Sequence, residues 1–174
     1  VKFKPVKVLN DAGSGNFEWI TTAIKTEDIE NRAFLNSKTF VVGNMSLGGG
    51  TGKVASTEAA LKASNELGVI YCVAAGNTGT LGVNYPGNSQ YVLGVGSLDQ
   101  SLKRSSFSTF GPEVWNAEPG SSIYSTYKGN TFATLSGTSM ATPFQSALCA
   151  IALSKWGAVL SNQVTKKQYI AWVA

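Results

Sequence analysis

A continuous apolar run over residues 69–75 is the feature that most limits what this 174-residue chain can fold into. A strand with one face in solvent alternates apolar and polar side chains, whereas a strand covered on both faces is apolar throughout. Residues 91–98 form a second such run. We therefore expect two interior strands of a parallel sheet that is covered on both sides.

Strand-like and helix-like segments alternate along the chain. Further strands are expected at 5–9 and 39–46, and irregular strands or a hairpin at 114–117 and 123–135. Helices are expected at 17–36, at 53–67 with Gly68 as its stop, at 139–154, and at 162–173 as an amphipathic terminal helix. This alternation predicts an α/β fold, a parallel sheet wrapped by helices, in one domain spanning residues 1–174.

Three loops rich in glycine and polar residues each follow an expected strand: residues 10–15, 46–50 and 76–79. In open parallel sheets, ligands bind beyond the carboxyl ends of the strands. We therefore expect these loops to form one binding cleft.

Composition excludes several other classes. Only 14% of the residues are charged and the net charge is +4, with no basic stripe, so nucleic-acid binding is not expected. The longest apolar runs are too short to cross a membrane, and the first residues lack a signal-peptide pattern.

Cys72 and Cys149 match no metal-ligand spacing. Both lie in apolar segments, which favours buried free thiols. A disulfide between them is the alternative.

Ser139 lies in the octapeptide 136–143, where an expected buried helix begins directly after Gly137. A hydroxyl at a helix N-terminus meets unpaired backbone amides and the positive end of the helix dipole, both of which favour a developing oxyanion. Serine and threonine are also common helix caps. On these residues alone, two interpretations are open. Ser139 is a nucleophile, or Thr138 or Ser139 is only the N-cap of the helix.

Asn77 directly follows the buried strand. Its amide either donates a hydrogen bond into the cleft or makes a local turn.

Taken together and in order, the motifs resemble those of the subtilisin-like serine peptidases. The matching segments are Val6–Leu9 with Gly13-Ser14-Gly15, Asn44–Gly49, Val73–Asn77, Tyr85-Pro86, Ser105–Ser108, Glu118-Pro119-Gly120 and Ser136–Pro143. The resemblance runs through most of the chain and implies a three-layer subtilisin-like fold.

By this resemblance, Ser139 is the nucleophile, and Asn77 with the N–H of Ser139 forms the oxyanion hole. The substrate-binding residues implied are Gly13, Ser14, Gly15, Ser46, Leu47, Gly48, Ala75 and Gly76. Because the cleft walls carry no charge, we expect uncharged or apolar residues before the cleaved bond. The resemblance also implies a cis Tyr85–Pro86 peptide bond. It further implies export of the protein from the cytoplasm.

The resemblance implies a peptide or protein substrate as partner, together with a propeptide or inhibitor. It also implies calcium, but we assign no metal ligands, because the loop 78–87 holds no carboxylate.

The chain contains no histidine, although a serine triad needs an imidazole to take the proton of the serine. The family order is Asp, His, Ser, and residue 1 already matches sequence beyond the histidine motif. We therefore expect an incomplete fold, completed by an upstream segment that supplies Asp and His, and no cleavage by this chain alone. The alternative is a subtilase-like structural or protein-binding module.

Two local departures stand beside the serine motif. Phe144 replaces the usual histidine after the proline, and Gln145-Ser146-Ala147 replaces a glycine-containing continuation.

An α/β-hydrolase esterase fits the sequence less well, because Ser139 lacks the Gly-x-Ser-x-Gly context. A phosphate loop also fits less well, since residues 47–52 lack the Gly-Lys-Ser/Thr ending.

Overall fold

The computed structural model describes residues 1–36 and 40–156 of the chain. Four parallel strands form its main sheet in the order β1 (Val42–Met45), β2 (Ile70–Ala74), β3 (Leu93–Leu98) and β4 (Val114–Pro119). Neighbours in the sequence are thus neighbours in the sheet. All five residues of β2 are buried, as the apolar run predicts.

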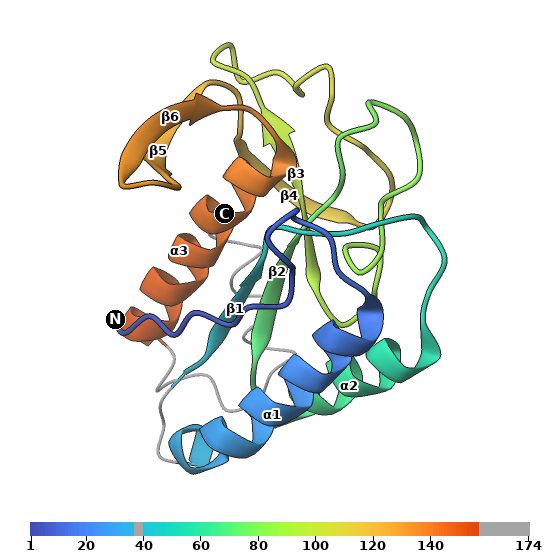
Figure 1. Ribbon diagram of the computed structural model, residues 1–174, viewed down its shortest axis with the longest axis vertical. Coiled ribbons are helices and arrows are strands. Elements are labelled where there is room, and N and C mark those ends of the chain that lie inside the picture. Colours follow the sequence, from blue (N-terminus) through green and yellow to red (C-terminus); the bar gives the residue numbers. More distant parts are fainter. Residues whose placement is uncertain (37–39, 157–174) are drawn as a thin grey trace.

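Helices cover both faces of this sheet (Figure 1). α1 (Phe17–Asn36) and α2 (Ala55–Leu67) lie side by side on one face, and α3 (Thr138–Trp156) packs on the other. Side chains of β2 alternate between two cores, because successive residues of a strand point to opposite faces. Tyr71 and Val73 join the α1 and α2 core, while Ile70 and Cys72 join the α3 core. The expected α/β fold is confirmed.

A two-stranded antiparallel hairpin, β5 (Ile123–Tyr127) and β6 (Thr131–Leu135), projects beside the start of α3 (Figure 1). Tyr124 and Phe132 face each other across it with ring centroids 5.5 Å apart. This confirms the hairpin expected over residues 123–135.

Gly68 ends α2 as predicted. Its φ of 112° lies in the left-handed region, and its N–H bonds the carbonyl of Asn65. The helix starts at Ala55 rather than residue 53, because Val54 is extended. The Tyr85–Pro86 peptide bond is cis, as the family resemblance implies.

The strand expected at residues 5–9 is wrong. The segment pairs with no strand in the described part of the chain and is mostly exposed. Its β-branched pattern suits a strand, but no neighbouring strand supplies ladder hydrogen bonds. The helix expected at 162–173 lies outside the described residues. Among the described helices, none is long and apolar enough to span a bilayer.

Candidate active site

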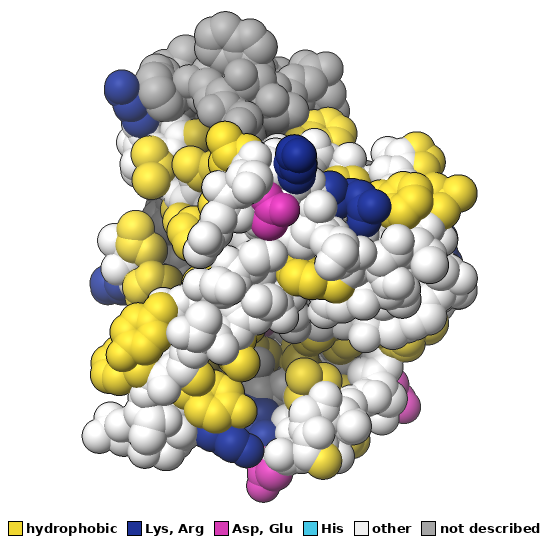
Figure 2. All heavy atoms as spheres, turned by 90° about the horizontal axis from the view of Figure 1, so that it is seen from above, with side chains coloured by type: hydrophobic (Ala, Val, Ile, Leu, Met, Phe, Trp, Pro, Cys, Tyr) yellow, Lys and Arg dark blue, Asp and Glu magenta, His cyan; other side chains and the backbone are white. Residues whose placement is uncertain are grey.

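Three chain segments meet at the carboxyl end of the main sheet. β1 leads into Ser46, β2 leads through Gly76 to Asn77, and α3 begins at Thr138. Hydrogen bonds join these segments although they are 61 to 93 residues apart in the sequence. Figure 2 looks down on this end of the molecule, where charged side chains are few and no broad patch of either sign gathers.

Asn77 is held by Thr138. The carbonyl oxygen of the Asn77 side chain accepts hydrogen bonds from the Thr138 backbone N–H at 2.8 Å and from its hydroxyl at 3.0 Å. The Thr138 hydroxyl in turn accepts the N–H of Gly76 at 3.2 Å and is fully buried. These bonds fix the orientation of the Asn77 side-chain amide: Oδ1 faces α3, and Nδ2 points away from it.

Two N–H donors stay open at this point. Neither Nδ2 of Asn77 nor the backbone N–H of Ser139 has a hydrogen-bond acceptor among the described residues. Asn77 is exposed and Ser139 is half-buried, so solvent or a ligand reaches both. Open donors at a helix N-terminus suit a negatively charged oxygen.

The hydroxyls of Thr138 and Ser139 do not cap α3. The Thr138 hydroxyl bonds Asn77 and Gly76, and the Ser139 hydroxyl donates to the carbonyl of Ser46 at 3.4 Å. The side chain of Asn77 instead caps the first N–H of the helix from another part of the chain. The purely capping interpretation of Ser139 therefore loses its basis.

Ser46 holds the backbone of Ser139. Its hydroxyl donates to the Ser139 carbonyl at 2.8 Å and accepts the Asn44 side-chain amide at 3.0 Å. Ser146 of α3 donates to the Asn44 side-chain oxygen at 3.0 Å. Neither Asn44 nor Ser146 was assigned a role from the sequence, and Thr138 was considered only as a helix cap, although the matched motifs contain Asn44 and Thr138.

Two backbone segments face each other in front of the sheet. Gly15 lies on one, and Leu47 and Gly48 lie on the other. The backbone N–H and C=O groups of these three residues have no partner in the described ranges. Unpaired backbone groups on an extended segment are the feature by which proteins bind a peptide as an added strand.

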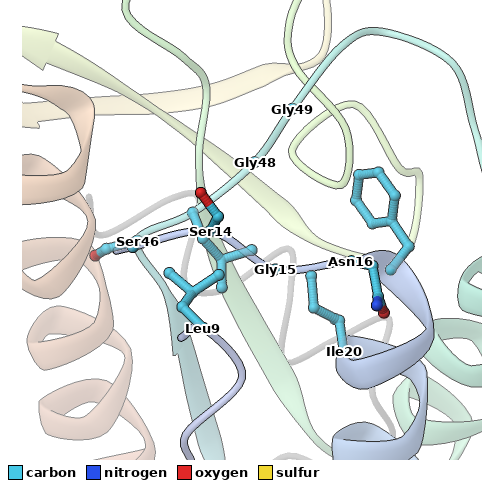
Figure 3. Close-up of a pocket in the computed structure, with 11 residues that line it drawn as sticks. Leu9, Ser14, Gly15, Asn16, Ile20, Ser46, Gly48 and Gly49 are labelled. Atoms are coloured by element: carbon cyan, nitrogen blue, oxygen red, sulfur yellow. The ribbon is translucent and has the colours of Figure 1, made fainter. Parts of the chain in front are cut away.

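A cavity of about 380 Å³ lies between these segments (Figure 3). It is lined by Gly13–Phe17 and Ser46–Gly49 together with Leu9 and Ile20. The structure thus brings together Gly13, Ser14, Gly15, Ser46, Leu47 and Gly48, the predicted substrate-binding residues that precede β2. The cavity carries no charged residue, and its apolar side chains are Leu9, Phe17, Ile20 and Leu47.

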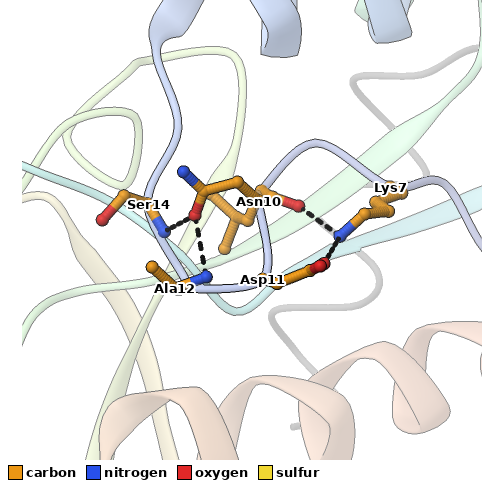
Figure 4. Close-up of polar contacts among 6 residues, drawn as sticks. Lys7, Asn10, Asp11, Ala12 and Ser14 are labelled. Carbon is orange, nitrogen blue, oxygen red and sulfur yellow. Dashed lines mark hydrogen bonds and ion pairs between the residues drawn. The ribbon is translucent and has the colours of Figure 1, made fainter.

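The first segment is shaped by a local turn (Figure 4). The Asn10 side-chain oxygen accepts the N–H groups of Ala12 and Ser14 at 3.0 Å each, and Gly13 adopts a φ of 75°. At Gly15, an added Cβ would lie 2.6 Å from the Val8 carbonyl oxygen, so only glycine fits without a shift.

Ala75 and Gly76, the other two predicted substrate-binding residues, do not line this cavity. Ala75 is fully buried, and its N–H and C=O are bonded to Val95 and Asn84. Gly76 has a φ of 113°, and both of its backbone groups are likewise bonded, to Thr138 and Thr109. The backbone groups of both residues are thus engaged within the protein.

The chain has no histidine to act as a general base for Ser139. None of the described aspartates hydrogen-bonds Ser139, because each is engaged elsewhere. Asp11 pairs with Lys7, Asp28 accepts the Ser64 hydroxyl, and Asp99 accepts N–H groups of its own turn.

The described residues do not fit a calcium site. They hold no cluster of three His, Cys, Asp or Glu side chains. In the loop 78–87, the carbonyls of Thr80, Asn84, Tyr85 and Pro86 already accept backbone N–H groups.

The comparisons with known proteins agree with this geometry. The family model described as "Subtilase family" matches residues 1–172, and the chain belongs to this family. It is 38% identical over 162 residues to a thermostable alkaline protease of Halalkalibacterium halodurans, covering 93% of this chain and 42% of the relative. It is 37% identical over 171 residues to subtilisin DY of Bacillus licheniformis, covering 96% and 59%.

Solved structures give the same fold. Sphericase superposes with a TM-score of 0.83 at 28% identity, covering 92% of this chain and 56% of that one. A cold-adapted subtilisin-like serine proteinase superposes with a TM-score of 0.75 at 31% identity, covering 94% and 56%. The chain therefore spans about half the length of these relatives.

Proposed function

We propose that this chain carries the nucleophile half of a serine endopeptidase site of the subtilisin type. The observation that carries the proposal is the pair of open donors, Asn77 Nδ2 and Ser139 N–H, beside the Ser139 hydroxyl. An acyl-transfer enzyme needs a nucleophile and two such donors around one reacting carbonyl.

In the proposed reaction, Ser139 Oγ attacks the carbonyl carbon of the scissile peptide bond and gives its proton to an imidazole. The negative oxygen of the tetrahedral intermediate takes hydrogen bonds from Asn77 and from the Ser139 backbone. The imidazole returns the proton to the leaving amine, and water then releases the acyl group from Ser139 by the same steps.

The imidazole and its aspartate come, in this proposal, from an upstream segment of the same domain. Within the described residues, β1 lies at the edge of the main sheet, with its second side unpaired. On α3, Phe144, Leu148 and Ile151 form an apolar stripe that is 38–61% exposed. An open strand edge beside an apolar stripe favours further strands packing there.

The substrate would bind as an extended strand between Gly15 and Leu47–Gly48, held by backbone hydrogen bonds. The uncharged apolar cavity between these segments favours an apolar substrate side chain. An uncharged residue directly before the cleaved bond is proposed on the same ground, since no charged residue occurs in the cleft segments 46–48 and 74–76. Export from the cytoplasm, and a propeptide or inhibitor as partner, stay proposals carried by the family resemblance.

A protease assay on the complete protein tests this function. The complete protein should cleave an unfolded protein substrate, Ser139→Ala should abolish cleavage, and the chain of residues 1–174 alone should cleave nothing. A substrate panel should show faster cleavage after apolar residues than after lysine or arginine. Full activity of Ser139→Ala would contradict the proposal, and a folded complete protein without activity would favour a structural or binding module.

A further inference from the structure

Cys72 and Cys149 meet in the core between β2 and α3. Their sulfur atoms lie 3.8 Å apart although the residues are 77 positions apart in the sequence, and both side chains are fully buried. β2 leads to Asn77, and α3 begins at Thr138 next to Ser139. A bond between the two sulfurs would therefore tie together the two elements that carry the candidate active site.

A chain of polar side chains, of which Gln145 is buried and Asn116 and Glu118 are half-buried, leads from β4 to the Cys149 sulfur. Gln145, itself fully buried, donates from Nε2 to the Cys149 sulfur at 3.5 Å. Its side-chain oxygen accepts the Asn116 amide at 2.7 Å, and Asn116 also donates to Glu118 at 2.9 Å.

The two thiols differ in acidity. The hydrogen bond with Cys72 lowers the pKa of Cys149, and the same contact together with burial raises the pKa of Cys72. In the folded protein, the contact between the two sulfurs is thus the largest influence on the acidity of both thiols, as expected for two side chains packed directly against each other.

We propose that Cys72 and Cys149 are a disulfide-forming pair that links β2 to α3 when the protein folds in the presence of a small-molecule disulfide. The thiolate of one cysteine attacks one sulfur of oxidised glutathione, for example, and releases one glutathione thiol. The other cysteine then loses its proton and attacks the protein sulfur of the mixed disulfide, which releases the second glutathione. The two cysteines are oxidised by two electrons, and the glutathione disulfide is reduced to two thiols.

The distance between the two sulfurs and the burial of both side chains determine at which stage of folding the disulfide forms. A disulfide needs a sulfur separation near 2.05 Å, so the two sulfurs must approach by roughly 1.8 Å, shared between two side chains. The packed core excludes glutathione, because neither side chain is accessible. The link therefore forms before α3 closes over the sheet, and it then resists added reductant in the native state.

Peptide mapping of the complete protein tests this proposal without relying on catalysis. The protein is unfolded, reduced and refolded in a glutathione redox buffer, and free thiols are alkylated in denaturant before non-reducing digestion. The expected product is a cross-linked pair of peptides containing Cys72 and Cys149, lighter by two hydrogens than the sum of the two. Alkylation of both cysteines in the refolded protein would overturn the proposal.

Stability gives a second readout with a matched control. Refolding in dithiothreitol instead of the glutathione buffer should lower the melting temperature of the wild type by roughly 5–15 °C, because the link closes a long loop. The same change should leave the double variant Cys72→Ala/Cys149→Ala unaffected. Equal melting temperatures of the two wild-type preparations would count against the link. If the double variant does not fold, the peptide map of the wild type still shows whether the disulfide between Cys72 and Cys149 forms.

Discussion

Ser46 and Ser139 hold each other through two hydrogen bonds that run in opposite directions. The Ser46 hydroxyl donates to the Ser139 carbonyl at 2.8 Å, while the Ser139 hydroxyl makes a longer bond of 3.4 Å to the Ser46 carbonyl. The short bond fixes the backbone at the start of α3. The long bond is weak, so in the proposed mechanism an imidazole would take over the Ser139 hydroxyl at little cost.

Ser46→Ala should lower kcat several-fold, because the lost hydroxyl bond is worth about 1 kcal/mol and holds the nucleophile in place. KM should change less, since the backbone of the substrate segment is unaltered. Steady-state kinetics of the complete protein check this. Ser106→Ala removes an exposed hydroxyl with no hydrogen bond in the described residues and should match the wild type. An unchanged kcat of Ser46→Ala would contradict the proposed positioning.

Asn77→Leu should lower kcat by roughly 10² to 10³-fold, the range measured for the corresponding asparagine of a subtilisin, with little change in KM. The lost Nδ2 donor no longer stabilises the oxyanion. The variant also loses the cap on Thr138, so its free energy of unfolding should fall by about 1 kcal/mol. Kinetics and urea unfolding separate the two effects. A stability loss with full kcat would mean that Asn77 is only a cap.

Thr138→Val should lower kcat by roughly 5 to 30-fold, because a buried hydroxyl that orients Asn77 is lost while the side-chain volume is kept. Thr138→Ser keeps the hydroxyl and should restore most of the activity. A Ser variant as slow as the Val variant would show that packing, not the hydrogen bond, matters at this position.

Gly15→Ala should raise KM for extended peptides, since the added Cβ pushes on the Val8 carbonyl and shifts the substrate segment. Gly52→Ala is the matched control, because its Cβ meets no atom within 4 Å. Assays with long and short peptides check this. Equal KM values for the two variants would remove the segment around Gly15 from the binding site.

Glu118→Gln should change how stability depends on pH. Burial raises the pKa of Glu118, so the folded state holds its proton to higher pH than the unfolded chain does. As pH rises through that window, the folded state binds more protons than the unfolded state, and the free energy of unfolding falls. The Gln variant cannot ionise, so it should gain stability over the wild type above the window and none below it.

Urea unfolding from pH 3.5 to pH 7 measures the difference in free energy of unfolding between the two proteins. This range begins below the ordinary pKa of glutamate, about 4.3, and extends well above it. The exposed Glu113→Gln serves as the control for loss of a surface charge. Parallel pH curves for wild type and Glu118→Gln would contradict the burial effect.

The sequence pattern predicted the interior strands of the sheet and the meeting of two of its glycine-rich loops, because both depend on local order along the chain. Val69–Ala75 predicts an interior strand without further information, and loops after parallel strands meet at one edge. The proximity of Ser139 to Asn77 was implied by the family resemblance alone, because Ser139 lies at the start of a helix and not in one of these loops. The sequence pattern failed at residues 5–9, where a strand-like pattern has no partner strand in the described part of the chain.

The sequence pattern could not predict contacts between residues that are far apart along the chain. Thr138 carries the same side chain whether it caps a helix or bonds an asparagine 61 positions away, and only packing decides. The contact between Cys72 and Cys149 likewise depends on which turn of α3 lies over β2. The sequence favours buried free thiols, which the structure shows, but it could not predict that the two sulfurs lie close enough to be linked.

Labelling by a fluorophosphonate tests the central claim most directly. Such a probe forms a stable bond only with a serine whose hydroxyl is activated and whose oxyanion is stabilised. In the complete protein, digestion and mass spectrometry should find the probe on Ser139, and the denatured protein and Ser139→Ala should stay unlabelled. A folded, complete protein with an unmodified Ser139, or a label on another serine, would contradict the assignment of Ser139 as the nucleophile.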